Sequence, residues 1–109
     1  MTAPPEPDIR LSRLEEERRQ TQRQLDLIDR QIIRRMTALI PTLAQKRTAY
    51  RRGKPPDPAA FLERYRAQLA AITAERQPEI DALSRELACQ DRTISALQNA
   101  IRKFAARRA

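Results

Sequence analysis

The stretch Arg52-Gly53-Lys54-Pro55-Pro56-Asp57-Pro58 interrupts an otherwise helix-forming chain near its middle. It contains the only glycine of the chain and three of its eight prolines, a combination that ends helices. Asp57 followed by Pro58 is typical of an N-cap residue and the first residue of a new helix. We therefore predict a turn over residues 53–57, with one long helix before it and another after it.

The segment before the turn has the apolar spacing of one long helix. Its apolar residues recur in steps of three and four, which places them on one helical face. They are Leu11, Leu14, Leu25, Ile28, Ile32, Met36, Leu39, Leu43 and Tyr50. We predict a helix from about Ile9 to Arg52 with Asp8 as its N-cap, and a disordered N-terminus over residues 1–8. Pro41 lies inside this helix and is expected to kink or break it.

The segment after the turn predicts a second helix over residues 58 to about 106. Pro78 either kinks this helix or splits it into two helices of about 18 and 28 residues. Beyond Pro78, apolar residues recur at two positions of a seven-residue repeat, which is typical of a coiled coil. One position contains Ile80, Leu87, Ile94 and Ile101, and the other contains Leu83, Gln90, Leu97 and Phe104.

A chain that folds back at Gly53 brings together residues whose numbers sum to roughly 108. In this register apolar residues of one helix face apolar residues of the other, so we predict an all-α fold, a long antiparallel helical hairpin of the coiled-coil type. The predicted seam between the helices consists of Leu11, Leu14, Leu25, Ile28, Ile32, Leu39, Leu43, Leu69, Ile80, Leu83, Leu87, Ile94, Leu97, Ile101 and Phe104. The register also sets Arg18 level with Gln90 and Asp91, a polar layer that would penalise slipped registers.

A two-helix hairpin buries little apolar surface, and this sequence has a second apolar line outside the predicted seam. The line is formed by Leu27, Ile33 and Ile40. We expect a further helix to cover it, supplied either by another copy in a four-helix bundle or by a partner protein. Of the two, self-association into a homo-oligomer is favoured.

The charge of the chain suggests acidic partners. Among 109 residues there are 22 Lys and Arg against 14 Asp and Glu, a net charge of +8. Residues 30–54 and 92–109 contain no acidic residue at all. The first of these segments surrounds the turn, and its tip is a candidate partner-binding surface. This basic tip consists of Lys46, Arg47, Arg51, Arg52 and Lys54.

The excess of basic residues is open to two alternative interpretations. Weak, non-specific nucleic-acid binding is the first, since basic segments neutralise phosphates. Few aromatic residues are present for base stacking, which argues against sequence-specific binding. The second is a solvated arginine-rich surface with no partner, which accounts for the charge equally well.

The composition excludes several kinds of chemistry. Histidine is absent and Cys89 is the only cysteine, so no zinc site and no histidine-based catalytic group can form. One glycine cannot make a Gly-rich phosphate loop. We expect no enzymatic activity, no metal and no cofactor. A lone cysteine, no apolar run of membrane-spanning length and no secretory signal lead us to expect a cytoplasmic protein without a membrane span.

The stretch Leu25-x-x-Ile28-Asp29-x-x-Ile32, with the Gly-x-Pro loop that follows, resembles the first helix and loop of the all-helical chorismate mutases. That family binds a dianion with inward arginines and a lysine, and with a polar pair shortly after the loop aspartate. In this chain the mid-helix arginine falls at Leu39 or Ile40, and the polar pair falls at Ala60 and Phe61. The resemblance implies a helical protein of that layout that lacks the active-site charges.

The stretch FLERYRAQLAAITAER over residues 61–76 supports a second resemblance. With the basic two-helix layout over residues 9–104, it is similar to the coiled-coil stalk proteins of flagellar and type III secretion export, the FliJ/YscO/HrpO group. That resemblance implies a cytoplasmic rod that docks on the export ATPase and contacts chaperones or the export gate. We therefore expect a non-enzymatic interaction or scaffold module, with a stalk or escort role in a type III secretion-like apparatus as its specific form.

Overall fold

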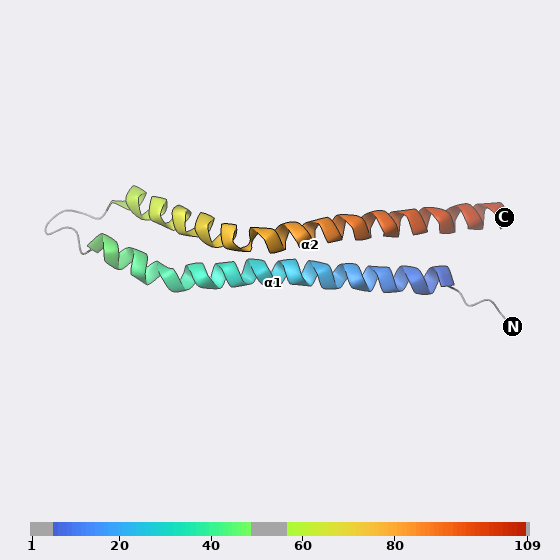
Figure 1. Cartoon of the computed structure of the whole chain (residues 1–109), viewed down its shortest axis with the longest axis horizontal. Helices are drawn as coiled ribbons and strands as arrows, with labels where there is room; N and C mark the ends of the chain where they lie inside the picture. The colour runs from blue at the N-terminus through green and yellow to red at the C-terminus, as the bar shows by residue number, and fades with distance from the viewer. Residues whose placement is uncertain (1–5, 49–56, 109) are drawn as a thin grey trace. The chain divides into compact units, whose positions relative to one another are not determined.

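The computed structural model describes the backbone of residues 6–48 and 57–108, and the side chains of residues 7–44 and 57–108. Helix α1 extends over Glu6–Thr48 and helix α2 over Pro58–Arg108 (Figure 1). The two helices pack against each other, and no strand occurs in the described residues. The predicted all-α helical hairpin is therefore confirmed.

The start of α2 is set by the cap that the sequence predicts. The backbone N–H of Ala59 donates to Oδ1 of Asp57 at 3.0 Å, and the N–H of Phe61 donates to the Asp57 carbonyl at 3.3 Å. An N-cap side chain satisfies one of the first helical N–H groups, which otherwise have no partner. Pro58 occupies the first helical position, where its missing N–H costs nothing.

The start of α1 differs from the prediction. Because α1 begins at Glu6, Asp8 lies inside the first turn and is not the N-cap, and residues 6–8 are helical. Pro7 is tolerated in a first turn, and acidic residues there favour the helix dipole. Residues 1–5 and 49–56 lie outside the described part of the chain, as do the predicted turn and the predicted end of the first helix at Arg52.

Neither internal proline ends its helix. Pro41 lies within α1 and Pro78 within α2, so the predicted alternative of two separate helices after the turn is wrong. A proline removes the hydrogen bond to the carbonyl four residues earlier, here those of Thr37 and Ala74. Both of these residues are exposed, so water can reach the vacated carbonyls.

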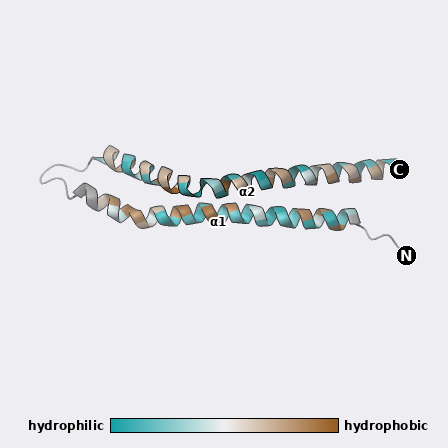
Figure 2. Ribbon diagram, in the orientation of Figure 1, coloured by the Kyte–Doolittle hydropathy of each residue, from teal (hydrophilic) through white to brown (hydrophobic). Residues whose placement is uncertain are grey.

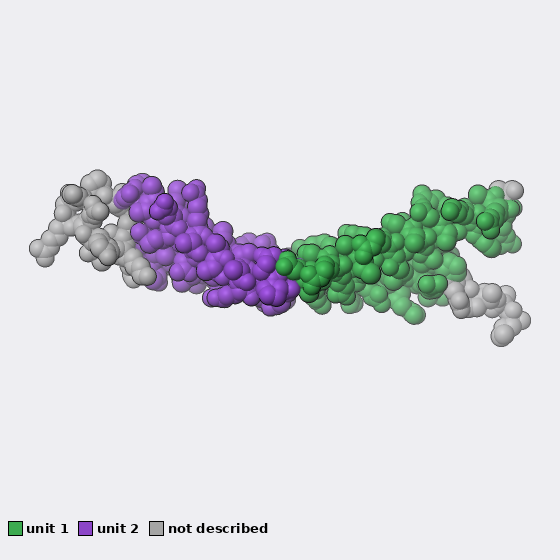
Figure 3. All heavy atoms as spheres, turned by 45° about the horizontal axis from the view of Figure 1, so that its top comes forward, with its two compact units in different colours: residues 1–26, 81–109 green, residues 27–80 purple. Residues whose placement is uncertain are grey.

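The packed helices form two compact units (Figure 3). Unit 1 combines residues 1–26 with 81–109, and unit 2 comprises residues 27–80. In each unit α1 and α2 run antiparallel (Figure 1). The polar contacts between the helices join residues whose numbers sum to within two of the predicted value. They include Arg18 with Asp91 in unit 1, and Arg35 with Glu75, Gln31 with Arg76 and Leu43 with Arg64 in unit 2.

The core of unit 2 lies between one face of each helix. Met36 of α1 and Ile72 of α2 are each 2% exposed, and Ile28, Ile32 and Leu43 are also buried. Leu39 and Ile80 of the predicted seam are half-buried here. Ile72 is absent from the predicted seam, although it is among the most buried side chains.

Leu69 of the predicted seam is exposed, which is a correction to the sequence analysis. The predicted register, in which residue numbers sum to about 108, sets Leu69 opposite Leu39. In the structure the most buried residue before Ile80 is Ile72, which lies two steps of four from Ile80 by way of the half-buried Arg76. Such a stutter shifts the contact face of a coiled coil, and here it turns Leu69 outward.

Unit 1 has a thinner core. Ile94 is buried, and the other contact residues are half-buried, namely Leu11, Leu14, Leu25, Leu83, Leu87, Leu97 and Ile101. Phe104 is predicted in the seam but is 62% exposed, which is a second correction. The register sets Phe104 level with residue 4, whereas the described part of α1 begins at Glu6.

We predict that Asp57→Ala lowers the free energy of unfolding by about 1 kcal/mol, because the Ala59 N–H loses its side-chain acceptor. Urea unfolding followed by circular dichroism measures this loss. Asp57→Ser is the matched control, since serine is an equally good N-cap and should retain most of the stability. Equal destabilisation by both substitutions would contradict the capping role.

Candidate interaction surface

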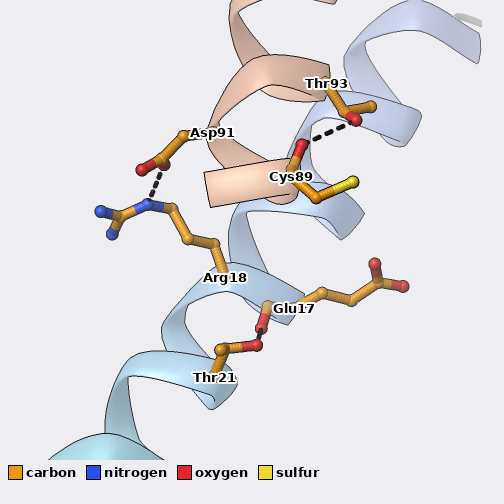
Figure 4. A network of polar contacts seen from close by, with 6 residues as sticks. All are labelled: Glu17, Arg18, Thr21, Cys89, Asp91 and Thr93. Atoms are coloured by element: carbon orange, nitrogen blue, oxygen red, sulfur yellow. Dashed lines mark hydrogen bonds and ion pairs between the residues drawn. The ribbon is translucent and has the colours of Figure 1, made fainter. Parts of the chain in front are cut away.

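Polar residues gather at one level of unit 1 (Figure 4). Nε of Arg18 donates to Oδ1 of Asp91 across the two helices. That hydrogen bond and the charge of Asp91 raise the pKa of Arg18 further above its usual range. Thr21 is 4% exposed, and its hydroxyl donates to the Glu17 carbonyl of its own helix at 3.1 Å. The predicted polar layer thus brings Arg18 and Asp91 together.

Gln90, the third residue of the predicted polar layer, is half-buried on α2. Its Oε1 atom is buried and accepts no hydrogen bond from the described residues. A buried acceptor without a donor costs stability, so this level adds little to the strength of unit 1. Its effect is on alignment, because a shifted register would set the Arg18 charge against leucine side chains.

Glu16 belongs to a separate, exposed cluster on α1. Arg19 lowers the pKa of Glu16, first through a side-chain hydrogen bond of 2.9 Å and then through its charge. Arg23 lies 3.7 Å from the same carboxylate. Because the pKa is lowered on folding, the stabilisation is present above the usual glutamate pKa and is lost as the pH falls below it.

We predict that Arg18→Asp and Asp91→Arg each destabilise unit 1, since each places like charges opposite one another. The double exchange should recover stability, with a coupling energy of no more than about 1 kcal/mol for a pair this exposed. A double-mutant cycle by urea unfolding measures the coupling. A coupling of zero would mean that the two side chains do not meet in solution.

Unit 2 has a polar side that ties its helices together. Nη1 of Arg35 lies 2.8 Å from Oε2 of Glu75, and Nη1 of Arg76 donates to Oε1 of Gln31 at 2.8 Å. Arg76 also pairs with Glu79 at 3.1 Å. These contacts lie on one flank of the helix–helix contact. The charged side chains of this flank are therefore paired within the chain.

The other flank of unit 2 is apolar, although hydropathy alternates along both helices in Figure 2. Ile33 and Ile40 of α1 are 55% and 39% exposed, and Leu62 and Leu69 of α2 are 45% and 36% exposed. At 3.6 residues per turn, both pairs lie about a quarter of a turn from the buried residues of their helix. Because the helices are antiparallel, the two displacements point to the same side. We call these four residues the apolar face of unit 2.

A shallow open groove adjoins this face on α2. It encloses about 490 Å³ and is lined by Arg66, Leu69, Ala70, Thr73, Ala74 and Gln77. The small side chains of Ala70, Thr73 and Ala74 leave the hollow between longer neighbours. The apolar face therefore continues from Leu69 along α2.

Leu27 does not belong to the same line as Ile33 and Ile40, which corrects the sequence analysis. It is 50% exposed, but it lies about a third of a turn away from the other two around α1. Phe104 belongs to unit 1, where the Arg108 guanidinium covers its ring at 5.4 Å from the ring centre. The sequence analysis did not identify Leu62 as an exposed apolar residue. Its spacing of seven residues from Leu69 indicates that the two lie on the same face of α2.

The predicted basic tip lies outside the described side chains. Lys46 and Arg47 belong to α1, but only their backbone is described. Arg51, Arg52 and Lys54 fall in the undescribed segment. The second basic segment is described on α2 and is exposed. It contains Arg92, Arg102, Lys103, Arg107 and Arg108. None of these five forms an ion pair with a described carboxylate.

The described residues offer no group of acidic, cysteine or histidine side chains that could hold a metal ion. Neither α1 nor α2, over their described lengths, is apolar and long enough to span a membrane. Cys89 is exposed on α2. Comparison with protein-family models, with curated proteins and with solved structures finds no match to the chain.

Proposed function

We propose that this chain is a non-enzymatic interaction module that binds helical protein through the apolar face of unit 2. The observation that carries the proposal is the difference between the two flanks of that unit. Its charged side chains pair within the chain on one flank, whereas branched apolar side chains are exposed on the other. An amphipathic helix laid into such a surface buries apolar area on both partners.

The specific form of the proposal is a stalk or escort component of a type III secretion-like apparatus. It rests on the resemblance to the FliJ/YscO/HrpO group carried by residues 61–76. Within that stretch Phe61, Tyr65 and Ile72 are buried or half-buried, while Leu62 and Leu69 are exposed. The stretch would thus hold the hairpin together on one side and contact the partner on the other. A cytoplasmic location and self-association belong to the same proposal.

A photo-crosslinking amino acid at position 33 or 62 should form adducts with one defined protein in the native cells. The reason is that both positions are about half exposed on the apolar face. Mass spectrometry of the adducts identifies the partner, and an export ATPase or one of its associated proteins would support the secretion role.

The matched control is the same amino acid at position 27, because Leu27 is equally exposed but lies away from the apolar face. We expect no adduct there with the same protein. If positions 33 and 62 give no adduct with another protein, or only the adducts that position 27 gives, the proposal of a client protein is wrong.

Non-specific nucleic-acid binding remains a second candidate because of the exposed basic end of α2. Arg102, Lys103, Arg107 and Arg108 are exposed within two turns of one another, next to the exposed ring of Phe104. Cations of this density bind phosphates, and an aromatic ring can stack on an unpaired base.

Replacing these four basic residues by glutamine should weaken DNA binding and flatten its salt dependence. The slope of log K against log salt should fall by up to about 0.9 per lost phosphate contact. Titration of a labelled duplex over a range of salt concentrations measures the slope. The control replaces Arg10, Arg13, Arg34 and Arg85, which are exposed elsewhere. An equal effect of both quadruple substitutions would mean that the binding depends only on the net charge of the chain.

A further inference from the structure

We infer that the apolar face of unit 2 is occupied by the same face of a second copy of this chain. The inference deepens the proposed function, since it names an occupant for the proposed surface. It rests on the geometry of the face and on the charges around it.

The geometry of the face suits a two-helix occupant. Ile33 and Ile40 come from α1, and Leu62 and Leu69 come from α2, so the face is two helices wide. A single client helix fills the groove between two helices, whereas a second hairpin covers both. Two hairpins packed face to face give a four-helix bundle, in which exposed apolar residues become a central layer. A two-fold axis makes such an interface self-complementary, because the same patch is used twice.

Four charged residues lie beside the face. Asp29 and Arg30 lie one turn before Ile33, and Arg66 lies between Leu62 and Leu69, with Glu63 one turn before it. All four are exposed, and none forms an ion pair within the described residues. The charges of these four residues are of both signs and sum to zero, although the chain as a whole carries +8.

The charges beside the face favour a second copy of the chain over a polyanion. A nucleic acid or another polyanion is attracted by a basic surface, so it would favour the end of α2 over this face. A second copy of a strongly basic chain is repelled wherever basic surfaces meet. The charges of the four residues beside the apolar face of unit 2 sum to zero, and because they are unpaired and of both signs they can pair with those of the copy.

The test uses the full chain and sedimentation equilibrium. The wild type should have twice the monomer mass of 12.6 kDa at about 0.1 mM protein. Ile33→Glu combined with Leu62→Glu should raise the dissociation constant by at least about 100-fold, because apolar contacts are replaced by repelling carboxylates. Leu27→Glu is the matched control and should remain dimeric. Circular dichroism checks that all variants keep their helices, which is expected because the substituted side chains are already half exposed.

A second pair of variants tests whether the faces meet each other. Ile33→Lys with Leu62→Lys should also be monomeric alone, and an equimolar mixture with the glutamate variant should restore the dimer. A monomeric wild type, a dimer that survives the glutamate substitutions, or a mixture that stays monomeric would overturn the inference. The photo-crosslinking amino acid at positions 33 and 62 separates the two proposals. Adducts with a second copy of the chain support the dimer, whereas adducts with another protein alone support a client and would overturn the dimer.

Discussion

The packing of α1 against α2 in one antiparallel register is the constraint on which every other feature of this protein depends. It decides which side chains are enclosed between the helices and which remain on the flanks. The ion pair between Arg18 and Asp91 in unit 1 and that between Arg35 and Glu75 in unit 2 obey the same register. A slip of one helical turn, about 5.4 Å along the axis, would separate both pairs.

That register produces two unlike flanks in unit 2. On one flank Arg35 and Arg76 satisfy carboxylates and an amide of their own chain, so this side has no need of a partner. On the other flank the branched side chains remain in water, with charges of both signs around them. Exposed apolar residues are common singly, but four on one side of a two-helix unit mark a candidate binding surface. The unit therefore stabilises itself on one side and offers the other for association.

Much of this arrangement follows from sequence reasoning, and its failures have physical causes. Asp57 with Pro58 located the start of α2, and the level of Arg18 with Asp91 followed from counting back from one glycine. The predicted register placed Leu69 in the seam because it assumes an unchanged helical period, whereas the steps Ile72, Arg76 and Ile80 shift the contact face. Asp8 was misjudged because Glu6 and Pro7 also suit a first helical turn. Sequence reasoning did not place the exposed apolar residues of both helices on one flank, because that placement depends on how the two helices face each other.

The distance along the chain between contacting residues has a consequence for how the hairpin forms. Arg64 reaches the carbonyl of Leu43 across 21 residues, whereas Arg18 reaches Asp91 across 73. Closing a short loop costs less entropy than closing a long one, and each closed contact shortens the loop that the next must close. Helix pairing should therefore begin beside the capped end of α2 and proceed toward the chain termini. Unit 2 would then be assembled first, with its apolar side available for association while unit 1 is still pairing.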